Sequence, residues 1–348
     1  MLNLTRYLPA TALSLCLAGT VAAAPADSAA TEARNLWHQG IAAGYQQLAQ
    51  KALTLDTNAK AYCESPSESS RQALDKAWLD GFLAWQQVRF VDFGPVEKDN
   101  RGWQFQFWPD AKNLVGRKAG YLLGSDTPLD GDTLSGHGVA VQGFPMVEYL
   151  LFDDTLNGTD RALPGARACE LLTAVSSHIA ATASDLSGEW QAFREAYTGN
   201  ELYTDTSIRA AMNALEILED RRLANPMGLR GNGNRSPYRA EAWRSGRSLA
   251  AVQASVAGLQ KYFLPAFTGL MEARGQSQLA ADINAQTTEI LEHFPALDTP
   301  MAGLLSDDGK FRSLQGLYVD VSQLVAQVND QAAVALGVVR GFNSSDGD

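Results

Sequence analysis

The sequence is poor in the residue types that most often hold metals or cofactors. Its 348 residues include only four histidines and three cysteines. It contains no His-Glu-Xaa-Xaa-His sequence, so the usual ligand set of a zinc peptidase is absent. It also contains no Cys-Xaa-Xaa-Cys pair, which excludes the common cysteine metal motifs.

Positive charge is scarce as well. The chain has 28 Lys and Arg residues against 39 Asp and Glu residues, a formal net charge of −11 at pH 7. Removing residues 1–23 takes away one basic and no acidic residue, which leaves 27 against 39 and a net charge of −12. Such an acidic chain is a poor candidate for general nucleic-acid binding.

Long uncharged apolar runs are missing except at the N-terminus. There, Arg6 is followed by an uncharged stretch over residues 7–24, and small residues precede a plausible cleavage point after Ala23. This pattern predicts a signal peptide over residues 1–23 and a soluble, exported product. Leu15 stands before Cys16 where a lipidation signal requires a small residue, which argues against a lipid anchor. No later stretch approaches the roughly 18 apolar residues of a membrane span.

Two cysteines remain after the predicted cleavage. Cys63 and Cys169 lie far apart in the sequence, and an oxidising exported setting permits a disulfide between them. Two separate buried thiols are the alternative.

Apolar residues recur every three or four positions through most of the chain, which predicts amphipathic helices. No strand-like alternation competes with this spacing, so we expect an all-α fold of two tandem helical bundles, residues 24–200 and 201–348. The expected helices cover Glu32 to Leu55, Glu68 to Phe90, Gly136 to Phe152, Ala162 to Ser184, Trp190 to Tyr197, Thr206 to Leu223, Ala240 to Pro265, Gln276 to Phe294 and Phe311 to Leu336. Helical spacing disappears between Val91 and Ser135, and a loop of that length is usually functional or packed as a lid.

The stretch from Gly143 to Leu151 places one carboxylate, Glu148, among apolar and aromatic residues. Burying an ionised carboxylate alone costs several kcal/mol, roughly, so Glu148 needs a partner or a bound cation. Pro145 lacks a donor N–H and must either start a helix or kink one.

Arg89 is our predicted partner for Glu148, because it falls on the apolar stripe of its helix and a bidentate pair would satisfy both groups. Such a pair could form the polar floor of a cleft with Trp85, Trp108 and Tyr149 as aromatic walls. Alternatively it could be a buried ion pair that only fixes two helices, with the aromatic residues as ordinary core.

An arginine-rich segment lies in the second half of the chain. Between Arg221 and Arg247 there are seven arginines and one acid, Glu241, a local charge of +6. Arginine suits planar anions such as carboxylates and phosphates, so an anionic ligand could dock there. The alternative is salt bridging to the acidic loops around residues 126–132 and 153–154.

With these residues the chain resembles the imelysin-like proteins, a bacterial exported family linked to iron uptake. The resemblance covers nearly the whole mature chain and rests on the segments Trp78 to Arg89, Phe107 to Asp110, Gly143 to Leu151, Arg244 to Gly258 and Gly341 to Asp348. It implies a periplasmic protein of two helical bundles with a cleft between them. The family signature is Gly-Xaa-His-Xaa-Xaa-Glu, and here Gly143 and Glu148 match it while Pro145 takes the histidine position.

The resemblance also implies where a ligand would bind. It carries over Glu148 as a ligand-binding residue and tentative metal ligand, with Gly143 and Phe144 from the same motif and Ser245 and Arg247 from the second bundle. Proline has no donor atom, so the histidine–glutamate pair that would hold a cation is broken. His137 lies eleven residues before Glu148, about 16 Å along a straight helix, and would replace it only if the chain folded back.

Three functions follow from the resemblance and the residues. The first is a non-catalytic protein of an iron-acquisition system, which captures iron, an iron carrier or another component of that system at the cleft beside Glu148. The second is a binding protein for an anionic polysaccharide. The third is the metallopeptidase activity from which the family takes its name, and the missing histidine argues against it. The sequence leaves the cofactor unknown, and it favours iron over zinc because hard Fe(III) prefers oxygen ligands and does not require the missing histidine. One carboxylate alone is a poor iron site, so a co-bound chelator or further oxygen ligands would be required.

Overall fold

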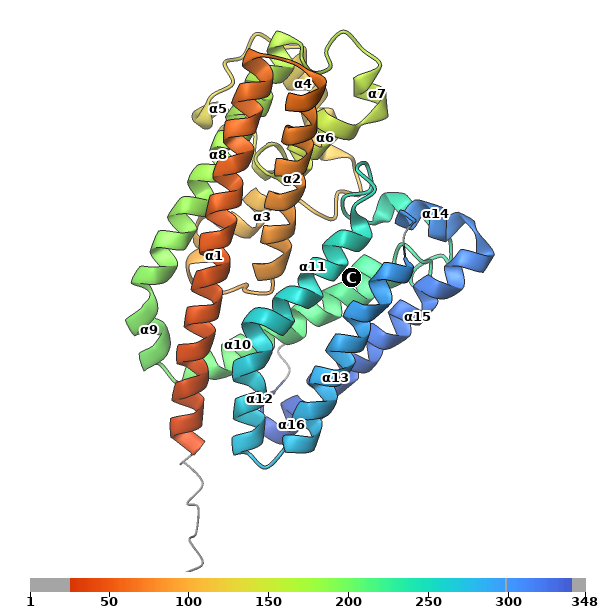
Figure 1. Ribbon diagram of the computed structural model, residues 1–348. Coiled ribbons are helices and arrows are strands. Elements are labelled where there is room, and N and C mark those ends of the chain that lie inside the picture. Colours follow the sequence, from red (N-terminus) through yellow and green to blue (C-terminus); the bar gives the residue numbers. More distant parts are fainter. Residues whose placement is uncertain (1–25, 298, 340–348) are drawn as a thin grey trace, which may run out of the picture.

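The computed structural model describes residues 26–297 and 299–339, and all regular elements within them are helices (Figure 1). This confirms the all-α prediction. No helix among these residues is long and apolar enough to cross a membrane. The predicted signal peptide and the segment Gly341 to Asp348 lie outside the described residues.

Three long helices form the first group: α1 (Ala26–Glu64), α2 (Glu68–Val88) and α8 (Ala166–Ala192), which run side by side in Figure 1. The predicted stripe of α1 is buried, with Trp37, Ile41 and Leu48 almost fully removed from solvent. Ser67 caps α2 by accepting a bond from the backbone N–H of Ser70. Cys63 at the end of α1 forms a disulfide with Cys169 in α8.

The expectation of a long loop between Val91 and Ser135 is wrong in part, because short helices fill much of this segment. They are η1 (Gly94–Val96), η2 (Lys98–Asn100), α3 (Arg101–Phe105), α4 (Leu114–Leu123) and α5 (Gly131–Gly136), followed by η3 (Val139–Val141). Helix α4 contains Gly116 and Gly120, and glycine has a low helix propensity, so the sequence gives little indication of this helix. A Cβ atom on Gly116 would lie 3.0 Å from the ring of Tyr149, so the glycine allows α4 to pack closely on the helix that carries Tyr149, α6 (Phe144–Phe152).

Helix α6 (Phe144–Phe152) carries Glu148 and begins later than the predicted start near Gly136. Pro145 lies in its first turn, where a missing N–H costs nothing. A side chain on Gly143 would overlap the carbonyl oxygens of Gln104 and Phe105, so only glycine allows this approach. Asp153 ends α6 and caps α7 (Asp154–Asn157).

The second half forms another group of helices, coloured green to blue in Figure 1. Helix α9 (Arg194–Gly199) follows α8 and packs on α1, so it lies with the first group (Figure 1). The elements of the second group are α10 (Leu202–Glu216), η4 (Ile217–Ala224), η5 (Pro237–Arg239), α11 (Ser248–Gly258), η6 (Leu259–Phe263), α12 (Leu264–Ala273), α13 (Ser277–His293), η7 (Phe294–Ala296), α14 (Met301–Ser306), α15 (Asp308–Val325), η8 (Ala326–Ala332) and α16 (Ala333–Leu336). The predicted helix from Ala240 begins instead at Ser248. Residues 225–247 are therefore mostly irregular, and they supply much of the site described below.

Helix α11 packs on α2 and joins the two groups. Gly258 in α11 faces the backbone of Gln87 so closely that a Cβ atom would overlap it. One cluster of buried apolar residues extends through both groups. The division into bundles at residue 200 stays a prediction.

Candidate functional site

Glu148 lies on a cavity of about 590 Å³ that is bounded by both halves of the chain. Its wall is made by α2, the segment after α3, the start of α6 and the irregular segment before α11. Aromatic side chains dominate it: Trp78, Phe82, Phe107, Trp108, Phe144, Tyr238 and Trp243. Pro145 and Glu148 both line the cavity, so the position of the family's histidine and its glutamate share one face of α6.

The Glu148 carboxylate is 4% exposed and is held by one residue of the second half. Its Oε1 atom accepts hydrogen bonds from the backbone N of Ser245 at 2.9 Å and from the Ser245 Oγ at 2.8 Å. Burial raises the pKa of Glu148, against the opposing effect of these two bonds. Glu148 therefore has a hydrogen-bond partner, Ser245, a residue that the family resemblance suggested for ligand binding and not for this contact.

Arg244 fixes Ser245 in place. Its Nε donates to Asp153 Oδ2 at 2.7 Å, and its Nη2 donates to Asn113 Oδ1 at 2.9 Å. The guanidinium also lies 4.3 Å from the ring centroid of Trp243 and 5.2 Å from that of Tyr149. Burial opposes ionisation of Asp153, but its bonds from Thr155 and Arg244 outweigh burial and lower the pKa of Asp153. Arg244 therefore ties the irregular segment to the end of α6.

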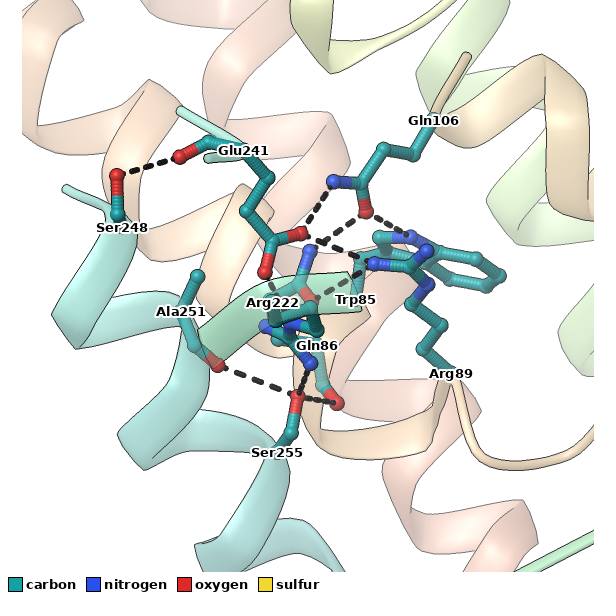
Figure 2. Close-up of polar contacts among 9 residues, drawn as sticks. All are labelled: Trp85, Gln86, Arg89, Gln106, Arg222, Glu241, Ser248, Ala251 and Ser255. Atoms are coloured by element: carbon teal, nitrogen blue, oxygen red, sulfur yellow. Dashed lines mark hydrogen bonds and ion pairs between the residues drawn. The ribbon is translucent and has the colours of Figure 1, made fainter. Parts of the chain in front are cut away.

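The predicted pairing of Arg89 with Glu148 is wrong. Arg89 Nη1 instead donates to Glu241 Oε2 at 3.0 Å (Figure 2). Within the described residues, Arg89 forms its ion pair with Glu241 and not with Glu148. Helix α2 ends at Val88, one residue earlier, so Arg89 follows the helix rather than continuing its buried stripe. Its side chain points toward Glu241, which is 2% exposed.

Glu241 is the centre of a buried polar network, drawn in Figure 2. Its Oε2 accepts a second bond from Gln106 Nε2 at 2.7 Å, and its Oε1 forms an ion pair with Arg222. Arg222 further donates to Gln86 Oε1 at 3.0 Å and to Ser255 Oγ at 2.7 Å. Burial lowers the pKa of Arg222 to about 10, with Glu241 opposing this and Arg89 adding to it. The network joins α2, η4 and α11 through charged groups.

Trp85 belongs to this network and not to the wall beside Glu148. Its Nε1 donates to Gln106 Oε1 at 3.0 Å. Trp85 and Arg89 line a second cavity of about 460 Å³, and Gln106 and Trp108 line both cavities. The Glu241 network therefore separates two neighbouring cavities.

The other predicted site residues have distinct positions. Phe144 is fully buried, lines the Glu148 cavity and accepts a bond from Trp78 Nε1 at 3.1 Å. Tyr149 lies against Arg244 and outside the lining of both cavities. Arg247 is exposed and is also outside both linings.

Four of the seven clustered arginines form ion pairs within the described residues. The pairs are Arg222 with Glu241, Arg230 with Asp220, Arg235 with Asp308 and Arg244 with Asp153. Only Asp153 comes from the acidic loops that we expected as partners. Most of the local positive charge is thus balanced inside the protein and is not free for a polyanion.

The described side chains around Glu148 do not provide enough ligands to hold a metal ion without a further molecule. Within residues 26–297 and 299–339, no three His, Cys, Asp or Glu residues come together as a metal site. His137 bonds to the carbonyl of Thr133 and does not line the cavity. Glu148 is therefore the single carboxylate of the family motif that remains, and it lacks the companions a structural or catalytic metal requires.

The prediction missed Glu241, Gln106 and Asp110, which all line the Glu148 cavity. Two signals were present. Glu241 is the lone acid among the clustered arginines, and Gln106 is the polar residue between Phe105 and Phe107 in a segment already singled out. Asp110 caps α4 by accepting bonds from the N–H groups of Leu114 and Val115, at 2.7 and 2.9 Å.

Comparisons with known proteins agree with this architecture. The sequence profile of the imelysin family, Peptidase M75, matches residues 41–328. An imelysin-like protein from Psychrobacter arcticum 273-4 is 20% identical, with a TM-score of 0.79 over 92% of this chain and 98% of that chain. A putative iron-regulated protein A precursor from Parabacteroides distasonis ATCC 8503 is 14% identical, with a TM-score of 0.65 over 89% of this chain and 96% of that one. A search of curated proteins found no match.

Proposed function

Because this chain belongs to the imelysin family, we propose that it is a non-catalytic, periplasmic binding protein of an iron-acquisition system, which captures an organic iron carrier beside Glu148. The family match supports this, as does the fold shared with a protein described as an iron-regulated protein A precursor. The predicted signal peptide supports export.

The observation that carries the proposal is a buried carboxylate with one unused oxygen in an aromatic cavity. Both bonds from Ser245 go to Oε1, and no described residue donates to Oε2 of Glu148. Glu148 lines the cavity, so a ligand there can donate a hydrogen bond or bring a cation to Oε2, and a hydrogen bond to a charged group contributes about 1.5–3 kcal/mol. Glu241 and Asp110 line the same cavity, but Glu241 is paired with Arg89 and Arg222, and Asp110 caps α4. Glu148 is therefore the carboxylate of this wall that can contact a ligand.

The walls favour an organic carrier over a bare ion. Iron held by a chelator brings its own oxygen ligands, so the protein need not supply a complete set. Trp108, Trp243 and Tyr238 offer flat faces on which the rings of a chelator can stack. Arg239 also lines the cavity and supplies positive charge for an anionic complex.

Iron retention tests the proposal directly. The protein without residues 1–23 is incubated with Fe(II), Fe(III), zinc, ferric citrate or a ferric catecholate, then desalted, and its metal is measured by elemental analysis. We expect close to one iron per chain with a ferric chelate and none with the uncomplexed ions. Glu148→Gln should weaken chelate binding at least tenfold, whereas Glu195→Gln on the exposed face of α9 should not.

The other outcomes contradict the proposal in different ways. Zinc or iron bound without a chelator, and lost in Glu148→Ala, would indicate a metal centre and favour the peptidase. Absence of binding by every iron species would remove the iron carrier as ligand. Salt-sensitive binding of an anionic polysaccharide, lost when Arg239 and Arg247 are neutralised, would favour the polysaccharide function.

A further inference from the structure

The second cavity, of about 460 Å³, has an open mouth and a buried inner wall. Asp92, Glu97 and Trp103 are exposed and form the mouth, and the Trp103 side chain is 47% exposed. Gln86 and Arg222 on the inner wall are buried. The cavity lies on the opposite side of the Glu241 network from Glu148.

Uncompensated negative charge is concentrated at this mouth. Asp92 Oδ2 accepts a bond from Asn213 Nδ2 at 3.0 Å, and Glu97 Oε2 accepts one from the backbone N of Gly94 at 2.8 Å. Neither carboxylate forms an ion pair with any described residue. The guanidiniums of the inner wall, by contrast, both pair with Glu241.

The two carboxylates influence each other. Solvent reaches Asp92 at the mouth, but the surrounding protein removes enough water from its carboxylate to raise its pKa. The bond from Asn213 opposes this, and the charge of Glu97 raises the pKa of Asp92 further. A cation bound between them would relieve both the desolvation and the mutual repulsion.

Aromatic and apolar residues complete the wall. Trp103, Trp108 and Phe90 line the cavity together with Ala214 and Ile217. Indole faces attract ammonium groups as well as apolar surface, by about 0.5–2 kcal/mol for the cation alone. An exposed tryptophan beside two unpaired carboxylates is thus suited to an amine that has an apolar body.

We propose that this cavity is a second ligand site, which binds small organic ammonium ions with an aromatic or aliphatic body. The ammonium group lies between Asp92 and Glu97, and the body packs between Trp103 and the apolar wall. The site is independent of Glu148 and of the proposed iron carrier, because the Glu241 network separates the two cavities.

Three probes of similar size and different charge test this site: 2-phenylethylamine, 2-phenylethanol and 3-phenylpropanoate. Binding is measured by calorimetry at pH 7 and by tryptophan fluorescence. We expect the amine to bind at least tenfold more tightly than the neutral alcohol, and the carboxylate to bind most weakly. The double variant Asp92→Asn/Glu97→Gln should remove the preference for the amine, and it keeps an oxygen to accept the bond from Asn213.

Two controls separate the site from general charge and from the first cavity. Glu195→Gln removes one exposed acid elsewhere, and Glu148→Gln alters the other cavity, so both should bind the amine as the wild type does. Trp103→Ala should lower the affinity for the amine while circular dichroism stays unchanged. Equal binding of amine and alcohol, or unchanged amine binding by the double variant, would overturn the proposal. Loss of amine binding in Glu148→Gln would overturn the independence of the two cavities.

Discussion

Arg89 Nη1 lies 3.0 Å from Glu241 Oε2, which ties the end of α2 to the segment that leads into α11. Glu241 thus receives two guanidiniums, because Arg222 pairs with its other oxygen. The three groups are removed from water together, and the cost of that removal is balanced only while all of them are present. This makes Glu241 the residue whose loss leaves the most buried charge unpaired.

Glu241→Gln should therefore reduce the free energy of unfolding by about 3–5 kcal/mol, the usual cost of removing one partner of a buried pair. Urea unfolding followed by circular dichroism measures this. Asp308→Asn is the matched control, because it breaks the Arg235–Asp308 pair where Asp308 is 91% exposed. The control should change the unfolding free energy by less than about 1 kcal/mol. Similar losses in the two variants would contradict the central role of Glu241.

Glu148→Gln should change the dependence of stability on pH. The pKa of Glu148 is raised above its ordinary value of 4.5, so the folded state holds its proton more tightly than the unfolded state. The contribution of Glu148 to the free energy of unfolding is therefore fully present below the pKa that it has in the unfolded chain. This contribution is lost as the pH rises through the pKa that Glu148 has in the folded protein. Glutamine cannot ionise, so the variant should gain stability relative to the wild type as pH rises above 4.5. Unfolding curves from pH 4 to 8 measure this, and a difference that stays constant or falls would contradict the assignment.

The largely buried Arg244–Asp153 pair should contribute a larger interaction energy to the free energy of unfolding than an exposed ion pair does. Asp153→Asn keeps an oxygen that can cap α7, and Arg244→Met keeps much of the packing on Trp243. The double-mutant cycle should give about 1–3 kcal/mol of interaction energy. The lowered pKa of Asp153 also means that its contribution is lost as pH falls through its folded value, below 3.8. The Arg235–Asp308 cycle is the comparison, and an equal coupling energy there would show that burial adds nothing.

The helices could be predicted because their burial follows local spacing, as the buried stripe of α1 shows. Helix α4 could not, since its Gly116 is explained only by the close approach of Asn113 and Tyr149, which the spacing of the sequence does not show. Glu148 could be identified as a buried carboxylate, but its partner lies 97 residues away in an irregular segment. Spacing carries no information about such a contact. The same limit explains the error at Arg89, whose partner depends on how α2 meets the segment before α11.

The disulfide between Cys63 and Cys169 provides the last test. It links residues 106 positions apart, so it removes conformational freedom from a large part of the unfolded chain. The chain-entropy relation gives roughly 4–5 kcal/mol for a loop of this length, and removal of native disulfides typically costs about 2–5 kcal/mol. Cys63→Ser/Cys169→Ser should lower the unfolding free energy by an amount in that range and increase the denaturant m-value, because the unfolded chain becomes less compact. Reduction of the wild-type protein should reproduce both changes. The unreduced protein without residues 1–23 should show no free thiol in guanidinium, and two thiols per chain there would contradict the pairing.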